Sequence, residues 1–143
     1  MKIEIKLDKT SLFTEHPEEV VETFFELSSE ILTSNIKKHT PVDYGKLRGS
    51  WTPKQSKTKL VVSNSRNYAL FVEKGTGIFG PKRHRIFPRS AKVMHANIKG
   101  KDVFFRHSRG QAGRHMAEKG VLEYQKQIPK LLRTALIQVT EKW

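Results

Sequence analysis

The segment GTGIFG, residues 75–80, has the glycine spacing G-x-G-x-x-G that binds the pyrophosphate of a dinucleotide in many proteins. In that chemistry the glycines turn a strand tightly into a helix, and the N-terminal amides of the helix hold the phosphates. Pro81 and Pro88 exclude an uninterrupted helix directly after the motif. The next acidic residue after Glu73 is Asp102, which comes too late to bind a ribose hydroxyl. We therefore expect no nucleotide and no other cofactor.

Four histidines follow this motif, and histidine often serves as a metal ligand or a general base. They are His84, His95, His107 and His115, separated by 11, 12 and 8 positions. These spacings fit no common ligand pair, and few carboxylates lie nearby to orient the rings. The chain has no cysteine, which excludes disulfides, thiolate zinc sites and cysteine nucleophiles. We predict no catalytic or metal site; a metal-dependent nuclease using Glu73 or Asp102 with His84 is the third alternative.

Positive charge is the most prominent property of the composition, with 27 Lys and Arg against 14 Asp and Glu and a net charge of +13. Residues 1–40 carry five basic against eight acidic side chains, whereas residues 41–143 carry 22 against six. The densest part is 82–115, with ten Lys and Arg, four histidines and one acid. Such a field attracts nucleic acid, acidic protein surfaces or anionic membranes, and a solvated basic surface is the plain alternative.

The basic segment also contains aromatic residues, so it suits both phosphate neutralisation and base stacking. Phe87, Phe104 and Phe105 lie between the sequences KRHR and RHSRG. Val103, Phe104 and Phe105 also fit an ordinary strand with one or two core phenylalanines, which is the interpretation we favour for them. Residues 106–113 are polar and glycine-rich, as in an arm that becomes ordered on a partner. Candidate contacts with a partner protein or DNA are Lys82, Arg83, His84, Arg85, Arg89, Arg106, Arg109 and Arg114.

Apolar periodicity predicts the elements that must position these residues. Alternation predicts a strand at 2–7, and apolar residues at helical spacing predict a helix over 17–38 that starts at Pro17 and ends before Pro41. A short helix should follow, capped by Asp43. Further strands are predicted at 50–54, 59–64, 67–74, 91–98 and 101–107, and helices at 114–126 and 129–141. Pro129 should kink or divide the last helical region, and Lys99-Gly100 should form a hairpin turn.

The length of 143 residues fits one domain, 1–143, with one hydrophobic core. No apolar run approaches 18 residues, and the N-terminus is charged from its second residue. We therefore expect neither a membrane span nor a signal peptide, and no membrane partner.

Two motifs in this order resemble the tail-completion or head–tail joining proteins of long-tailed bacteriophages. The segment TPVDYGKLRGSW, 40–51, is similar to the family pattern T-P-V-D-T-G-x-L-R-x-S, and YALFVEKGT, 68–76, is similar to Y-A-x-Y-V-E-x-G-T. With the flanking helices and the basic loop, the similarity covers about residues 17–140. Tyr44 and Phe71 depart from the family pattern, and the segment QAGRHMAEKGV lacks the proline-rich form found before the last helix. These departures leave the exact position in the phage neck open.

The resemblance implies an α+β fold: a small, mainly antiparallel sheet flanked by an N-terminal and a C-terminal helix, with a long basic loop or hairpin arm at 77–113. It implies a structural virion protein without catalytic activity, which forms a ring that completes the tail and joins it to the head connector. The implied partners are other copies in a ring, six-fold by analogy, the tail-tube and head-connector proteins, and possibly the passing DNA. The implied location is the virion neck, and the host cytoplasm during assembly. A basic nucleic-acid-binding domain is the alternative function.

We expect the family-motif residues to form a scaffold that directs 77–113 outward. These residues are Asp43, Gly45, Leu47, Arg48, Tyr68, Glu73, Gly75 and Thr76. Arg48 is expected to be free to pair with a carboxylate such as Glu73, at the end of a strand, and Gly77 and Gly80 are expected to act as a hinge. In a ring, the acidic helix face at 15–30 would contact the basic loop of a neighbour.

Overall fold

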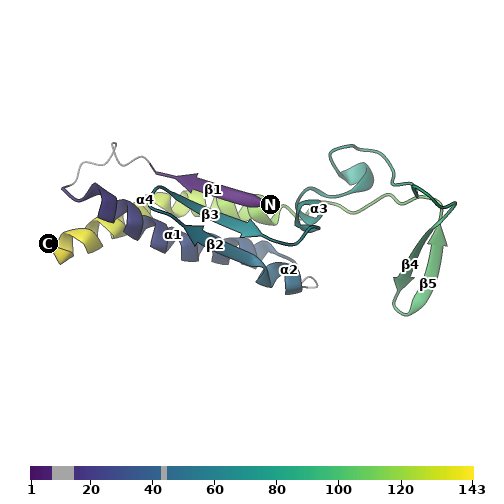
Figure 1. The fold of residues 1–143 in the computed structure, drawn as a ribbon, viewed down its shortest axis with the longest axis horizontal. Coiled ribbons are helices and arrows are strands. Elements are labelled where there is room, and N and C mark those ends of the chain that lie inside the picture. The colour runs from purple at the N-terminus through teal and green to yellow at the C-terminus, as the bar shows by residue number, and fades with distance from the viewer. Residues whose placement is uncertain (8–14, 43–44) are drawn as a thin grey trace. The chain divides into compact units, whose positions relative to one another are not determined.

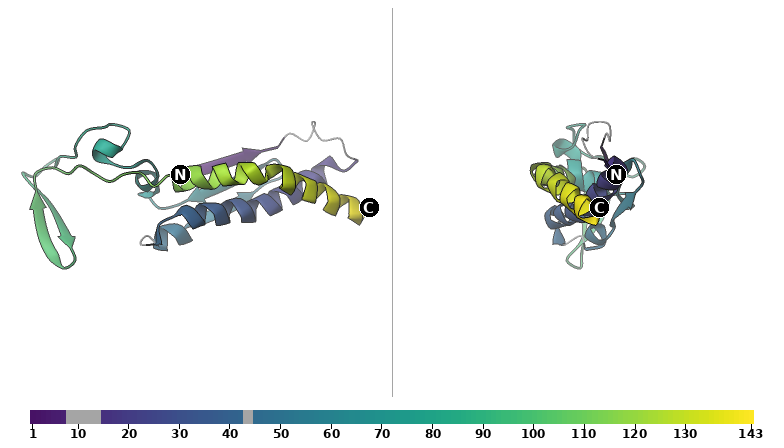
Figure 2. Two further views of the ribbon diagram at one scale, coloured as in Figure 1. Left: turned by 180° about the vertical axis from the view of Figure 1, so that it is seen from behind. Right: turned by 90° about the vertical axis from the view of Figure 1, so that its left-hand side faces the viewer.

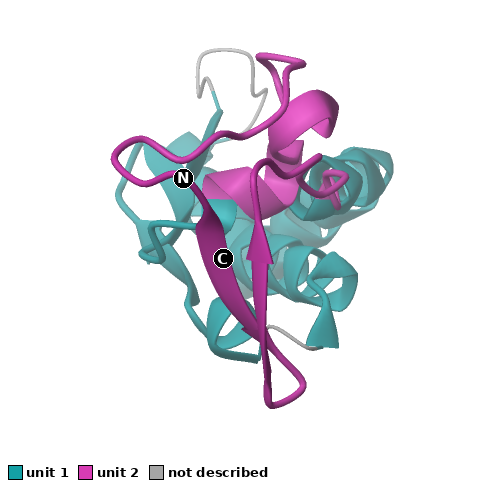
Figure 3. Cartoon of the chain, turned by 90° about the vertical axis from the view of Figure 1, so that its right-hand side faces the viewer, with its two compact units in different colours: residues 1–69, 116–143 teal, residues 70–115 magenta. Residues whose placement is uncertain are grey.

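The computed structural model describes residues 1–7, 15–42 and 45–143 (Figure 1). The chain forms two compact units, which Figure 3 shows in different colours. Residues 1–69 and 116–143 form the core unit, and residues 70–115 form the arm unit. Helices and small antiparallel sheets are both present, with a long helix near each end of the chain, so the predicted α+β class is confirmed.

The core unit contains a three-stranded antiparallel sheet in the order β1-β3-β2. Its strands are β1 (Lys2–Lys6), β2 (Trp51–Gln55) and β3 (Lys59–Asn64), which confirms the strands predicted at 2–7, 50–54 and 59–64. Ile3 pairs with Val62 on one side of β3, and Trp51 pairs with Asn64 on the other. Alternate residues of β3 are buried, which is the pattern of a strand with one face against a core. Pro53 is tolerated because β2 is an edge strand.

Two long helices lie on the same side of this sheet (Figure 2). Helix α1 (Pro17–His39) begins with a proline and two glutamates and ends with basic residues, in agreement with its dipole. It packs against β2 and β3, and helix α4 (Met116–Lys142) lies along it. Pro129 is accommodated inside α4, so the expected division of this region into two helices is wrong.

The core lies between α1, α4 and the sheet, and several of its buried polar groups bind one another. Tyr124 donates a hydrogen bond from its hydroxyl to Ser28 Oγ at 2.9 Å, and Trp51 Nε1 donates to Thr40 Oγ1 at 3.1 Å. Burial raises the pKa of Tyr124. The two helices come closest at Gly120, where a Cβ would lie 2.6 Å from Ile36 Cγ1. The close packing of α1 against α4 therefore requires glycine at position 120.

The short helix α2 (Gly45–Gly49) is present where the sequence predicts it. Leu47 is fully buried, and its carbonyl accepts a hydrogen bond from Asn64 Nδ2 at 2.9 Å. The expected cap, Asp43, lies outside the described residues. A buried side-chain hydrogen bond thus links α2 to β3, and the Leu47 side chain belongs to the core.

The arm unit consists of short elements, and one of them differs from the prediction. Helix α3 (Ala69–Lys74) replaces the strand predicted at 67–74. A short apolar run does not distinguish a strand from a helix, and here Ala69 and Glu73, four residues apart, are both buried. The 3₁₀ helix η3 (Gly77–Phe79) follows, and then the hairpin β4 (Met94–Ile98) and β5 (Lys101–Phe105). The predicted turn at Lys99-Gly100 is confirmed, with φ values of 52° and 81°.

Candidate functional site

The arm unit is built from two chain segments that pair through their backbones. Residues 76–86 lead toward the β4–β5 hairpin, and residues 108–111 lead back from it. Thr76 N donates to Gln111 O at 2.8 Å, and Ile78 N donates to Arg109 O at 2.9 Å. Further out, Ile86 and Ser108 exchange two backbone hydrogen bonds of 2.8 and 2.9 Å. The expectation that residues 106–113 need a partner to become ordered is therefore wrong for the part of this segment that makes these bonds.

Four glycines allow the two segments to pack backbone against backbone, and we call Gly75, Gly77, Gly110 and Gly113 the glycine clasp. The first three have positive φ angles of 85°, 63° and 85°. A Cβ on Gly75 would lie 2.7 Å from Gly113 N, and a Cβ on Gly77 would overlap the carbonyl oxygen of Arg109. The expected hinge at Gly77 is therefore wrong, because this glycine closes the base of the arm. Gly80 is equally restricted, since a Cβ there would lie 2.9 Å from Gly75 O.

The family-motif residues occupy three places in the structure. Gly45, Leu47 and Arg48 form most of α2, and Arg48 is exposed. Tyr68 directly precedes α3 and is half-buried. Glu73 lies within α3 at 6% exposure, not at the end of a strand, and its pairing with Arg48 stays a prediction. Gly75 belongs to the clasp, where the neighbouring Thr76 Oγ1 accepts a hydrogen bond from Gln111 N at 3.0 Å.

All eight candidate contact residues are exposed, and all lie in the arm unit: Lys82, Arg83, His84, Arg85, Arg89, Arg106, Arg109 and Arg114. This unit carries eleven Lys and Arg against two acids, Glu73 and Asp102. Asp102 Oδ1 accepts hydrogen bonds from Asn97 Nδ2 at 3.2 Å and lies 2.9 Å from His95 Nε2. Glu73 is buried, and Asp102 contacts two neighbours, His95 and Asn97. The exposed basic side chains of the arm unit therefore face solvent or a partner.

The hairpin β4–β5 has two different faces. One face carries His95, Asn97, Asp102 and Phe104, and the His95 and Phe104 rings lie 5.0 Å apart. The other carries the cross-strand pairs Met94–Phe105, Ala96–Val103 and Ile98–Lys101, as the register requires. Phe104 is 65% exposed and Phe105 is half-buried, so the interpretation of these aromatic residues as core residues is wrong for Phe104. Phe87, outside the hairpin, is 62% exposed. The sequence did not distinguish the two faces, because the register of the hairpin was needed to assign them.

The residues of the nuclease alternative lie apart within the arm unit. Glu73 is in α3, at the end of the arm opposite to the hairpin that carries Asp102 (Figure 1). The partner of Asp102 is His95, not His84, and His84 Nδ1 lies 3.0 Å from the carbonyl oxygen of Arg85. Glu73, Asp102 and His84 therefore do not converge on one site, as the nuclease alternative requires of them.

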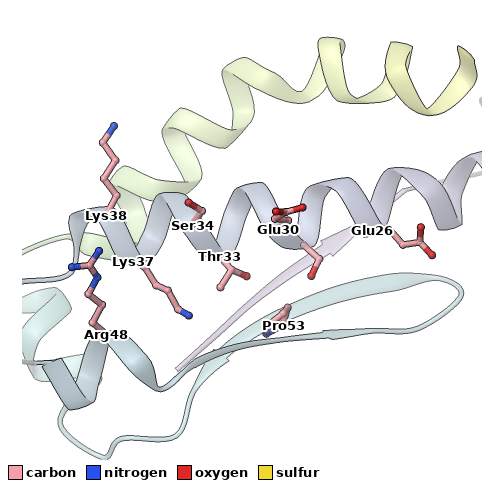
Figure 4. A pocket seen from close by; sticks show the side chains of 9 residues that line it. Glu26, Glu30, Thr33, Ser34, Lys37, Lys38, Arg48 and Pro53 are labelled. Atoms are coloured by element: carbon pink, nitrogen blue, oxygen red, sulfur yellow. The ribbon is translucent and has the colours of Figure 1, made fainter. Parts of the chain in front are cut away.

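A second candidate surface is an open groove in the core unit, between α1, α2 and β2 (Figure 4). Glu26 and Glu30 line it toward the start of α1, whereas Lys37 and Arg48 lie at its other end. Between them, Thr33 Oγ1 is buried without a hydrogen-bond partner among the described residues. The other lining residues are Ser29, Ser34, Lys38 and Pro53. This groove suits a polar segment with charges of both signs.

Residues 18–75 match the model of a protein family described as "Bacteriophage HK97-gp10, putative tail-component". No curated protein matches the chain, and no solved structure matches it. Within residues 1–7, 15–42 and 45–143, no helix combines the length and apolar character needed to cross a membrane. The matched residues run from the start of α1 through β2 and β3 into the glycine clasp, and they include nearly all of both sequence motifs. The resemblance to a phage tail-component family is thus confirmed: over residues 18–75 the chain is similar to HK97-gp10-like tail components.

Proposed function

We propose that this protein is a structural tail component of a phage, which forms a ring at the end of the tail and joins the tail to the head connector. The family match over residues 18–75 carries the proposal. The core unit would supply a rigid body, and the arm unit would supply the contacts. In this proposal both units act as a single domain of residues 1–143, and the protein has no catalytic role.

The distribution of charge supports self-assembly into a ring. The start of α1 is acidic, with Glu18, Glu19 and Glu22 within its first turns, whereas the arm unit carries eleven basic side chains. Two different, oppositely charged surfaces on one chain favour a head-to-tail contact, and such contacts close into rings when the rotation between subunits allows it. We propose that the acidic face at 15–30 contacts the arm of a neighbouring copy.

The finer features of the proposal follow the family resemblance. The ring would be six-fold, its other partners would be the tail-tube and head-connector proteins, and its arms could also contact the passing DNA. The protein would act in the virion neck after assembly in the host cytoplasm. The motif residues of α2 and α3 and those of the glycine clasp would hold the arm in position for these contacts.

Reversing charge in the arm tests the ring contact. We expect the triple variant Arg83→Glu, Arg85→Glu, Arg89→Glu to lose ring-sized particles in light-scattering mass measurements and to fail in tail joining. The matched control is Lys126→Glu, Lys130→Glu, Arg133→Glu, which makes the same charge change on exposed positions of α4. If the arm variant keeps the oligomer mass and the joining activity of the unmodified protein, the proposed contact is wrong.

Nucleic-acid binding is the second candidate function, and exposed aromatic residues within the basic arm favour it. Phe87 and Phe104 are both more than half exposed, so their rings are available for stacking on bases. This candidate predicts a monomer or dimer whose DNA or RNA affinity falls steeply with salt, by about 10³-fold or more between about 50 and 200 mM for six or more phosphate contacts. Mass measurement at several protein concentrations, with and without DNA, separates it from the ring.

A further inference from the structure

The β4–β5 hairpin leaves an apolar face uncovered. On this face Ile98 is 54% exposed and Val103 is 38% exposed, while Met94 and Phe105 are half-buried. A two-stranded ribbon is only marginally stable in water unless a further layer covers its apolar face. No residue of the hairpin is fully buried. The face therefore has the character of a surface that becomes buried on a partner.

The opposite face of the hairpin lacks this character, because its polar groups bind one another. Asp102 accepts the hydrogen bond from Asn97, and Asn97 Oδ1 accepts one from Gly100 N at 3.1 Å in the turn. His95 contacts both the Asp102 carboxylate and the Phe104 ring. A face whose polar groups are already paired gains little from a further partner. We therefore assign the docking role to the face that carries Ile98 and Val103.

The core unit contains a groove with complementary properties. It lies at the start of α1, where the half-buried side chain of Leu7 supplies apolar surface and Val21, at 3% exposure, lines the floor. Three carboxylates line the same groove, against a single lysine. The lining residues are Leu7, Glu18, Glu19, Val21, Glu22, Lys57 and Thr58. An apolar floor with an acidic border fits an apolar ligand surface that carries positive charge.

The apolar face of the hairpin has the matching charge. Lys101 lies on this face, directly opposite Ile98 in the register, and Lys99 lies in the adjoining turn. Lys101 and Lys99 are both exposed. A lysine can place its methylenes along an apolar surface while its ammonium group reaches a carboxylate at the border. The apolar and the charged parts of the two surfaces are therefore complementary.

We propose that the apolar face of the β4–β5 hairpin, with Ile98, Lys101 and Val103, docks into the groove formed by Leu7, Val21 and the adjacent glutamates in a second copy of this chain. This inference rests on the proposed ring, and it specifies which strands and which groove form the contact. A second copy fits better than DNA because phosphates do not complement an uncovered aliphatic face, whereas the groove supplies both apolar surface and carboxylates.

The first test compares the two faces of the hairpin. We expect the double variant Ile98→Ser, Val103→Ser to weaken self-association at least tenfold in sedimentation or mass measurements. Phe104→Ser is the matched control, since Phe104 is more exposed than either residue but lies on the other face; it should change self-association less than threefold. Circular dichroism and hydrogen exchange across the hairpin verify that both variants keep the fold.

The second test uses disulfide trapping, for which the cysteine-free chain is well suited. Val103→Cys protein is mixed with Glu22→Cys protein under mild oxidation, and we expect a disulfide between the two variants. Phe104→Cys mixed with Glu22→Cys should give much less of this product. The double variant Val103→Cys, Glu22→Cys is oxidised at low concentration, and an intrachain disulfide as its main product would overturn docking between copies.

The outcomes separate this inference from the ring itself. One outcome is that the double variant Ile98→Ser, Val103→Ser forms rings of unchanged mass and that no disulfide forms between Val103→Cys and Glu22→Cys. This outcome would overturn the docking surface and leave the ring proposal intact. Cross-linked dimers without larger particles would support the docking surface and overturn the ring. If the double serine variant loses DNA affinity while its self-association is unchanged, the face belongs to a nucleic-acid contact and the inference is wrong.

Discussion

The core unit and the arm unit differ in where they place their apolar residues. Every fully buried apolar side chain of the described structure lies in the core unit, among them Phe25, Leu32 and Trp51. Most of the exposed large apolar side chains lie in the arm unit, among them Phe87 and Phe104. The core unit is thus held by burial, whereas the arm unit is held by backbone pairing and closely packed glycines. The two units are therefore stabilised by different kinds of interaction.

Removing a core aromatic side chain tests the first half of this comparison and should have the largest effect. Phe25 is fully buried, so Phe25→Ala should lower the free energy of unfolding by about 3–5 kcal/mol through lost burial and cavity formation. Phe87→Ala, at an exposed position of the arm, should change it by less than about 0.5 kcal/mol. Urea unfolding followed by tryptophan fluorescence measures both. Equal effects would contradict the assignment of burial to the core unit.

The closest approach of α1 and α4 should be the next most sensitive position. Gly120→Ala places a Cβ within 2.9 Å of the Ile36 backbone, so we expect destabilisation of about 1–3 kcal/mol by overpacking. Gly49→Ala is the control, because a Cβ at this helical glycine meets nothing within 4 Å. That variant should be neutral or slightly stabilising because alanine has the higher helix propensity. Thermal unfolding of the two variants distinguishes a packing effect from a general effect of glycine replacement.

The glycine clasp should affect the arm unit alone. Gly77→Ala combines a positive φ with overlap of the Arg109 carbonyl, so the base of the arm should open more readily, by about 1–3 kcal/mol. Gly100→Ala has a similarly positive φ but meets nothing within 4 Å, and it should have a smaller effect. Hydrogen exchange at the Ile78 and Thr76 amides measures the opening. Faster exchange in α1 of the Gly77 variant would mean that the two units unfold together.

The smallest predicted effect is a pH dependence in the core unit. The hydrogen bond with His39, at 2.8 Å, lowers the pKa of Glu123 below its usual value of 4.5, and Lys38 contributes in the same direction. A carboxyl group with a lowered folded-state pKa stabilises the fold above its unfolded-state pKa, and this contribution is lost as the pH falls through the folded-state value. Glu123→Gln should therefore lower the melting temperature slightly at about pH 6, and the difference should vanish toward about pH 3. Glu141→Gln removes a carboxylate from the same helix and serves as the control.

The long elements of the core unit could be predicted because their signals are local and repeated. Alternation predicted β1, a short run between turn residues predicted β3, and helical spacing together with Pro17 predicted α1 within one residue. The run 67–74 gave a wrong result because seven or eight apolar-rich residues fit a buried strand and a short helix equally well. Pro129 was expected to kink or divide the last helical region, and the division is wrong because packing along α1 supports the helix on both sides of the proline.

The sequence by itself determined the α+β class, the long N-terminal helix, the hairpin turn and the concentration of positive charge in residues 82–115, because periodicity, turn chemistry and charge are local properties. The two motifs also determined the family resemblance that the match over residues 18–75 confirms. Only the tertiary structure decided what the glycines at 75–80 do, since their role depends on the returning segment at 109–113. It also decided which face of the hairpin is apolar and uncovered, because pairing across the ribbon, and not the order of residues along it, places side chains on one face.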